Sequence, residues 1–165
     1  MLGAALSKGC TQYLQSSDAM KKILVLSLLW IATTTFVQAE AKDLFTAARA
    51  NDVTLAAALI DSGADINQQD DKGYTPLILA TYDGSYEVAQ LLLKHHADTE
   101  KKDHSGRTAL MGVAFKGDER EAQLLLSNGA RADAKDAKGL TSMMYAVMFG
   151  RLSVIKVLRE NKISG

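Results

Sequence analysis

The sequence repeats itself every 33 residues, and this periodicity constrains the fold more than any other feature. The phrase GYTPLILA at residues 73–80 returns as GRTALMGV from Gly106 and as GLTSMMYA from Gly139. Further columns of like residues keep the same spacing. They are Asp70, Asp103 and Asp136; Thr75, Thr108 and Thr141; Asn51, Gly84, Gly117 and Gly150; and Gly63, His96 and Gly129. Such a repeat is typical of a solenoid, in which each unit buries its apolar face against its neighbours.

Each unit is expected to begin with a turn and a short helix. An Asp-x-x-Gly turn precedes the apolar stretch at residues 75–82. Thr75 is suited to cap the helix, and Pro76 is suited to its first turn, where the missing N–H has no helical acceptor. Gly84 can end the helix in a left-handed conformation without a Cβ penalty.

A second helix is expected from about Tyr86, because apolar residues follow it at helical spacing. Two isolated helices of this length are marginal in water, so the units are expected to stack on one another. The residues predicted to lie in the core or at the junctions between units are Ile78, Leu91, Leu92, Met111, Leu124, Leu125, Met143, Met144, Val154 and Leu158.

The units resemble ankyrin repeats, a family with a 33-residue period and a Thr-Pro-Leu-His-x-Ala signature. The letters TPL at residues 75–77 keep the start of that signature, and GADIN at residues 63–67 is similar to the end of a family repeat. The resemblance covers roughly residues 41–163. It implies an all-α ankyrin-repeat solenoid of about four helix-turn-helix repeats with short β-turn or hairpin fingers. The repeats are expected at about residues 41–69, 70–102, 103–135 and 136–163, the first using residues 43–50 as its inner helix.

The chain departs from the family pattern at two kinds of position. The signature histidine is replaced by Ile78, Met111 and Met144, which implies the loss of a hydrogen bond that braces the turns and hence a looser stack. His96 stands where the family has a left-handed glycine. A residue with a Cβ adopts that conformation at a cost of about 1 kcal/mol, so we expect one weaker junction there.

Residues 20–39 are predicted to be a signal peptide. A basic start at Met20–Lys22 precedes an apolar run at residues 23–32 and a small-residue site ending at Ala39. The apolar run is shorter than the roughly 20 residues that span a membrane, although an uncleaved anchor stays open as an alternative. Residues 1–19 are interpreted as an over-extended start upstream of Met20. If they are translated, they lengthen the basic region and weaken the prediction of export.

The charge balance argues against nucleic-acid and membrane partners. The chain has 19 Lys and Arg against 19 Asp and Glu, and three lysines but one aspartate lie before residue 40. The mature domain is therefore mildly acidic, without a basic field for nucleic acid or anionic lipid. The single cysteine, Cys10, lies in the part that would be removed. A thiol-free mature chain suits an oxidising compartment, and the short basic start suits bacterial export, so we expect a periplasmic protein.

The histidines are the first place to look for a metal site. His95, His96 and His104 lie near Asp98 and Asp103 in the sequence. Neighbouring residues at a helix end point in different directions, however, and no cysteine joins them. They are interpreted as solvent-facing residues at a junction.

No other motif indicates catalysis or a cofactor. Residues 65–69 resemble the start of a calcium loop, but Asp70 stands in place of its glycine and Pro76 in place of its glutamate. No nucleophile elbow and no phosphate-binding glycine loop occurs. The sequence thus predicts no catalytic residue, no metal and no cofactor.

The resemblance implies a concave binding surface made of the turn tips and the inner helices. The candidate residues at the tips are Asp71, Lys72, Tyr74, His104, Ser105, Arg107, Ala137, Lys138 and Leu140, and those of the inner helices are Arg49, Tyr82, Asp83, Phe115, Lys116, Met148 and Phe149. One column is the most informative, because arginine and aromatic side chains are enriched at interface hot spots. It contains Arg49, Tyr82, Phe115 and Met148. The alternative is that Phe115 and Phe149 pack against their own repeats.

These features together predict a non-catalytic protein-binding adaptor of the bacterial periplasm, monomeric by itself. The resemblance adds two specific settings. One is an accessory protein of a periplasmic antioxidant enzyme such as a catalase, for which haem handling would make the histidines matter. The other is an immunity protein against a delivered toxin. A membrane-anchored scaffold is the third alternative, distinguished by whether Glu40 is the mature N-terminus.

Overall fold

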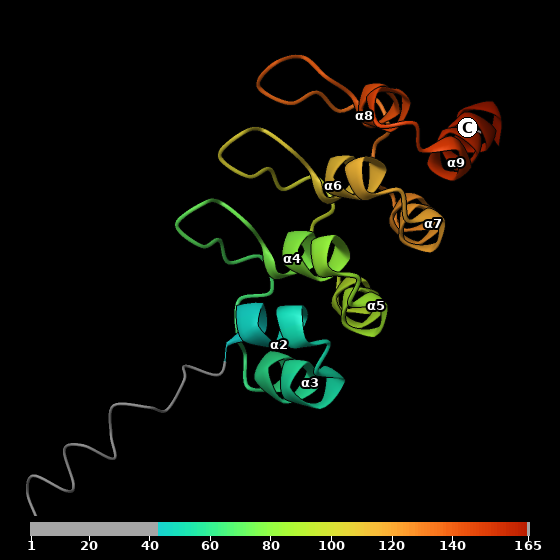
Figure 1. The fold of residues 1–165 in the computed structure, drawn as a ribbon. Coiled ribbons are helices and arrows are strands. Elements are labelled where there is room, and N and C mark those ends of the chain that lie inside the picture. Colours follow the sequence, from blue (N-terminus) through green and yellow to red (C-terminus); the bar gives the residue numbers. More distant parts are fainter. Residues whose placement is uncertain (1–42, 165) are drawn as a thin grey trace, which may run out of the picture. The chain divides into compact units, whose positions relative to one another are not determined.

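The computed structural model describes residues 43–164, and within that range the chain forms eight α-helices and no strand (Figure 1). The helices are α2 (Leu44–Ala50), α3 (Val53–Asp61), α4 (Pro76–Asp83), α5 (Tyr86–Lys94), α6 (Ala109–Lys116), α7 (Glu119–Ser127), α8 (Ser142–Met148) and α9 (Leu152–Ser164). The expected all-α class is therefore confirmed for this part of the chain. The predicted signal peptide at residues 20–39 and the segment 1–19 lie outside the described residues.

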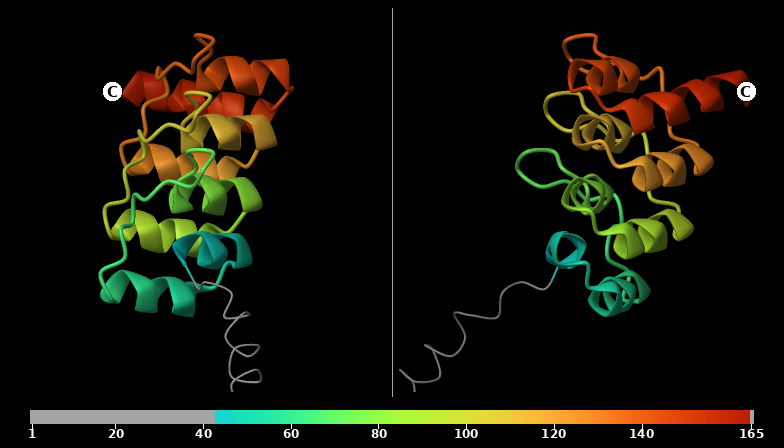
Figure 2. Two further views of the ribbon diagram at one scale, coloured as in Figure 1. Left: turned by 90° about the vertical axis from the view of Figure 1, so that its left-hand side faces the viewer. Right: turned by 45° about the vertical axis from the view of Figure 1, so that its right-hand side comes forward.

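The helices form two layers. Helices α2, α4, α6 and α8 stack side by side as an inner layer, and α3, α5, α7 and α9 form an outer layer (Figures 1 and 2). Each inner helix packs against the next inner helix and against the outer helix that follows it. The segments that join one helix pair to the next project from the inner layer as loops, as Figure 1 shows.

Helix α4 begins and ends where the sequence predicts. The hydroxyl of Thr75 accepts a hydrogen bond of 3.2 Å from the backbone N–H of Ile78, and Pro76 is the first residue of α4. Gly84 follows α4 with a φ of 83°. The left-handed conformation predicted for His96 is also present, with a φ of 63°.

The core lies between the two layers and is made mainly of leucine, alanine and valine. Of the residues predicted for it, Ile78, Leu92, Met111, Leu125, Val154 and Leu158 are buried, whereas Leu91, Leu124 and Met143 are half-buried and pack against it. Short side chains such as Ala47, Ala80, Ala114 and Ala146 are fully buried. They allow the inner helices to approach one another closely.

The prediction for Met144 is wrong, because this side chain is 47% exposed. Ile78 and Met111 hold the same position in α4 and α6, and both are buried. Each of these two helices is covered by the next inner helix, α6 or α8. No described helix packs beyond α8, so Met144 lacks the neighbour that would bury it.

The projecting loops carry three turns of one design, here called fingers: residues 70–74, 103–107 and 136–140. In the second finger, the N–H of Asp103 donates to the carbonyl of Arg107 at 2.9 Å, and the N–H of Gly106 donates to the carbonyl of Asp103 at 2.8 Å. The Asp103 carboxylate also accepts the N–H groups of Ser105 and Arg107 at 2.8 and 2.9 Å. The predicted turns are thus present, closed by hydrogen bonds rather than by strands.

Successive fingers are joined to each other through the backbone. The N–H of His104 donates to the carbonyl of Lys72, and the N–H of Ala137 donates to that of Ser105, both at 3.1 Å. This close approach explains one glycine in particular. Gly106 has a φ of 77°, and a Cβ there would lie 2.6 Å from the backbone nitrogen of Ala137. Any other residue would be strained and would push the next finger away.

Glu121 is a charged residue at a core position. It stands in α7 where the equivalent helices have Val88 and Val154, and it is 1% exposed. Neither carboxylate oxygen has a hydrogen-bond partner among the described residues. Burial, reinforced by the nearby charge of Asp118 and opposed by Lys116, raises the pKa of Glu121 to about 7. Ionisation of Glu121 therefore opposes folding.

The substitution Glu121→Val should stabilise the protein in a pH-dependent way. Because the folded-state pKa lies above the ordinary value of 4.5, the wild type loses stability as the pH rises from about 4.5 to about 7. The valine variant lacks this loss, so its advantage in free energy of unfolding should grow by about 2 kcal/mol between pH 5 and pH 8. Urea unfolding at both pH values measures it.

Glu119→Gln in the exposed first turn of α7 is the control and should leave the pH dependence as in the wild type. Equal slopes of stability against pH for the wild type and Glu121→Val would contradict the assignment of this loss to Glu121.

Candidate functional site

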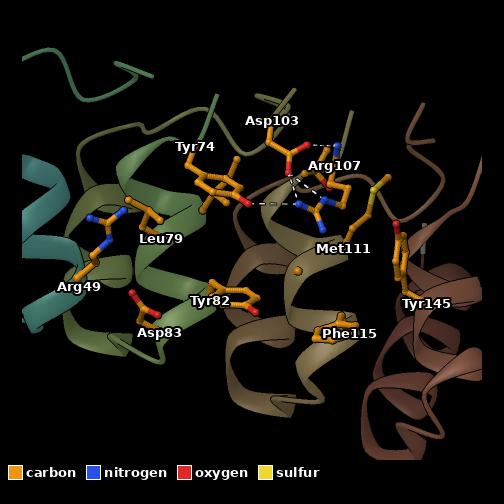
Figure 3. Close-up of a pocket in the computed structure, with 13 residues that line it drawn as sticks. Arg49, Tyr74, Leu79, Tyr82, Asp83, Asp103, Arg107, Met111, Phe115 and Tyr145 are labelled. Atoms are coloured by element: carbon orange, nitrogen blue, oxygen red, sulfur yellow. Dashed lines mark hydrogen bonds and ion pairs between the residues drawn. The ribbon is translucent and has the colours of Figure 1, made fainter. Parts of the chain in front are cut away.

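A pocket of about 340 Å³ opens on the inner layer and is here called the central pocket (Figure 3). It is lined by residues from α2, α4, α6 and α8 and from the first two fingers. These are Arg49, Tyr74, Ile78, Leu79, Tyr82, Asp83, Asp103, Arg107, Thr108, Met111, Gly112, Phe115 and Tyr145. Apolar and aromatic side chains thus share the pocket with a few polar groups, as in most ligand sites.

One residue of α6, Gly112, leaves space in the middle of the pocket lining. Leu79, Gly112 and Tyr145 occupy the same position in α4, α6 and α8. Gly112 carries no side chain, and a Cβ built there would meet no atom within 4 Å. A missing side chain in the middle of the row therefore leaves open space between Leu79 and Tyr145.

Arg107 is held at the edge of this space by two partners. Its Nε and Nη2 atoms donate to one carboxylate oxygen of Asp103 at 2.9 and 2.8 Å. Nη2 also lies 3.4 Å from the hydroxyl oxygen of Tyr74 (Figure 3). Burial lowers the pKa of Arg107, but the hydrogen bond and charge of Asp103 outweigh this effect and raise the pKa overall. The guanidinium is thus a fixed positive charge.

Tyr145 is fixed in a similar way by the third finger. Its hydroxyl donates to a carboxylate oxygen of Asp136 at 2.7 Å. Burial acts to raise the pKa of Asp136, but the bond from Tyr145 and the backbone N–H groups of Leu140 and Lys138 lower it overall. Burial and the same aspartate raise the pKa of Tyr145. The ring is therefore held in place from its hydroxyl end.

The opposite end of the pocket is more loosely organised. A guanidinium nitrogen of Arg49 lies 4.0 Å from the Asp70 carboxylate, and the Arg49 side chain is 57% exposed. Asp83 is exposed beside it. Ion pairs of this kind contribute little to stability. The guanidinium of Arg49 is therefore available to a partner.

The central pocket brings together six of the residues predicted for partner binding: Arg49, Tyr74, Tyr82, Asp83, Arg107 and Phe115. The other predicted residues lie outside its lining: Asp71, Lys72, His104, Ser105, Lys116, Ala137, Lys138, Leu140, Met148 and Phe149. The rings of Phe115 and Phe149 contact each other edge to face, with centroids 4.5 Å apart. The two phenylalanines thus pair across neighbouring helices rather than each within its own unit. The binding role of all these residues stays a prediction.

Sequence reasoning missed several residues of the lining. The sequence assigns Ile78 and Met111 to the core alone. It gives no binding role to five other residues of the lining: Leu79, Asp103, Thr108, Gly112 and Tyr145. The row of Leu79, Gly112 and Tyr145 contained a usable signal, because side chains of very different size at equivalent positions predict a local hollow.

The structure offers no metal centre within residues 43–164: no three His, Cys, Asp or Glu side chains cluster closely enough there to hold an ion. None of the three histidines lines the central pocket. Among the helices of the same range, none combines the length and apolar character needed to cross a bilayer.

Helix pairs stacked in two layers, with projecting turns and a pocket on the inner helices, define an α-helical repeat protein. The family model for ankyrin repeats (3 copies) matches residues 4–103, 44–136 and 95–164. The chain belongs to the ankyrin repeat family. No curated protein shows significant similarity to it. Ankyrin repeats generally mediate protein–protein interaction and form a non-catalytic module.

The substitution Tyr145→Phe should destabilise the protein at neutral pH by about 1 kcal/mol, since it removes a hydrogen bond to a charged group. The lowered pKa of Asp136 stabilises the fold above its ordinary pKa, and this contribution is lost as the pH falls through the lowered value. The difference between wild type and variant should therefore shrink as the pH falls below 3.8, the ordinary pKa of an aspartate, toward the lowered value. Thermal unfolding at pH 7 and at low pH measures it.

Tyr82→Phe is the matched control, because the Tyr82 side chain is 53% exposed and its hydroxyl has no hydrogen bond to a described residue that would be lost. If both substitutions had the same effect, the bond from Tyr145 to Asp136 would not be a stabilising contact.

Proposed function

We propose that this protein is a non-catalytic adaptor of the bacterial periplasm that recognises another protein through its inner layer. The observation that carries the proposal is the central pocket, where large exposed side chains surround an apolar floor. Tyr82 and Phe115 are 53% and 38% exposed, whereas Leu79 and Met111 of the same lining are buried. Surfaces of this composition are typical of interface hot spots.

The distribution of exposed apolar side chains supports the same face. Those on or next to the inner helices at positions that the next inner helix does not cover are Tyr82, Phe115, Met148 and Phe149. Met144 and Val147 are exposed for another reason, since no described helix packs beyond α8. On the outer layer, Val53 and Leu152 are the large hydrophobic side chains of this kind among the described residues. Exposed apolar patches on a soluble domain mark interaction surfaces. An immunity protein would use this face and differs from the general proposal only in the identity of its partner. An accessory protein that handled haem would also involve the histidines, none of which lines the central pocket.

Replacing Tyr82, Phe115 and Phe149 together by alanine should abolish capture of the partner from a periplasmic extract. Each hot-spot truncation costs about 2 kcal/mol or more, so the combined loss should exceed about 100-fold in affinity. The measurement is an affinity pull-down followed by titration of the captured protein. Circular dichroism checks that the variant keeps its helices.

Gln90→Ala with Gln123→Ala is the control, because both glutamines are exposed on the outer helices α5 and α7. A partner lost with the outer-layer pair and kept by the aromatic variant would place the interface on the other side of the molecule.

The location of the protein is tested at its N-terminus. The basic start, short apolar run and small-residue site support cleavage after Ala39, so the protein recovered from the periplasm should begin at Glu40. Intact mass and N-terminal sequencing after osmotic shock measure this. A membrane-bound product that retains residues 20–39 would instead support the anchored scaffold.

A further inference from the structure

Gly112 has no structural reason to be glycine. It lies inside α6, its φ is not in the left-handed region, and no neighbouring atom would contact a Cβ at this position. Glycine is among the least favourable residues in a helix interior, and alanine the most favourable. The residue therefore weakens its own helix, and its one visible effect is to keep the middle of the central pocket open.

The size and floor of this opening suit one large apolar side chain. A volume of about 340 Å³ is near the lower limit of ligand pockets, which run from about 300 to 1,000 Å³. Ile78, Leu79 and Met111 supply apolar walls, and all three are buried. The rings of Tyr82 and Phe115 stand at the rim in Figure 3. Aromatic side chains bury large apolar areas and contact other rings favourably edge to face.

The rim next to this opening carries a positive charge with unused hydrogen-bond capacity. Arg107 is 41% exposed, and its Nε and Nη2 atoms face Asp103 and Tyr74, whereas its Nη1 atom has no acceptor among the described residues. Asp103 is 3% exposed and already accepts bonds from Arg107 and the finger backbone, so its charge does not face a ligand. The remaining acid of the lining, Asp83, lies toward Arg49 and away from Arg107 (Figure 3).

We propose that the space above Gly112 receives an aromatic side chain of the partner protein, while a neighbouring Asp or Glu of that partner pairs with Arg107. The occupant is thus an exposed peptide segment in which an acidic and an aromatic residue lie close together. A guanidinium that is fixed in advance binds a carboxylate with little loss of side-chain entropy, here through the unused Nη1 atom. This inference rests on the proposed protein-binding function and specifies what that surface recognises.

The sharpest test fills the pocket without harming the fold. Gly112→Leu places a large side chain in open space and replaces glycine by a good helix former, so its thermal midpoint should equal or exceed that of the wild type. Gly112→Ala should give an intermediate result. Gln90→Leu on the outer helix α5 is the control for an added leucine.

The probe is a displayed library of random peptides selected against the full-length protein. The selected peptides should be enriched in an aromatic residue beside Asp or Glu. Fluorescence anisotropy should show about 10-fold or greater weakening by Gly112→Leu and no change by Gln90→Leu, since one buried aromatic anchor carries at least that much affinity. Changing the acid of the peptide to its amide should weaken binding by about 5-fold or more, and this loss tests Arg107 without altering the fold.

Three results would overturn the inference: no enrichment of any peptide, enrichment without the acidic and aromatic pair, or equal binding to Gly112→Leu and the wild type. A dimer of the wild type that Gly112→Leu abolishes would also overturn it, because the pocket would then belong to a second copy.

Failure of the inference differs from failure of the proposed function. If the natural partner binds Gly112→Leu but not the aromatic variant, the adaptor function stands and the inference about this pocket fails. If peptides bind the pocket and no protein is captured, the inference about the pocket stands and the adaptor function fails.

Discussion

The structure depends on an aspartate that begins each finger. One carboxylate oxygen of Asp70, Asp103 and Asp136 accepts two backbone N–H groups, two and four residues further along, at 2.8–2.9 Å. These bonds satisfy donors that a projecting turn would otherwise leave unpaired. They also give the fingers one shape, so that each can donate from its backbone to the finger before it. This contact recurs at the 33-residue period of the sequence.

The second carboxylate oxygen links the fingers to the candidate site. In the first finger this oxygen lies 4.0 Å from the guanidinium of Arg49, which belongs to α2. In the second finger it accepts a hydrogen bond from Arg107, and in the third it accepts one from the hydroxyl of Tyr145 in α8. All three partners line the central pocket. The groups that order the turns therefore also orient the polar side chains that a ligand would meet. Within this chain the partner of this oxygen differs from finger to finger, while the turn itself stays the same.

Local chemistry made most of the fold predictable. Thr75 and Gly84 mark the ends of α4 through capping and left-handed geometry, which depend on neighbouring residues alone. Tyr82, Phe115 and Arg107 were placed on the candidate surface by their position in the repeat. Gly112 and Tyr145 were missed because a hollow arises from three side chains on different helices. Met144 was misplaced because its burial depends on a further helix, which no described residue provides. The export signal and the compartment stay predictions.

The central claim is that the inner layer, at the central pocket, meets a partner protein. Site-specific photo-crosslinking in the producing cell tests it most directly, with a photoreactive phenylalanine in place of Phe115 or of Gln123, which is exposed on the outer helix α7. The account predicts a discrete crosslinked protein from position 115 and none from position 123. A crosslink from position 123 alone would contradict it and would assign recognition to the outer layer.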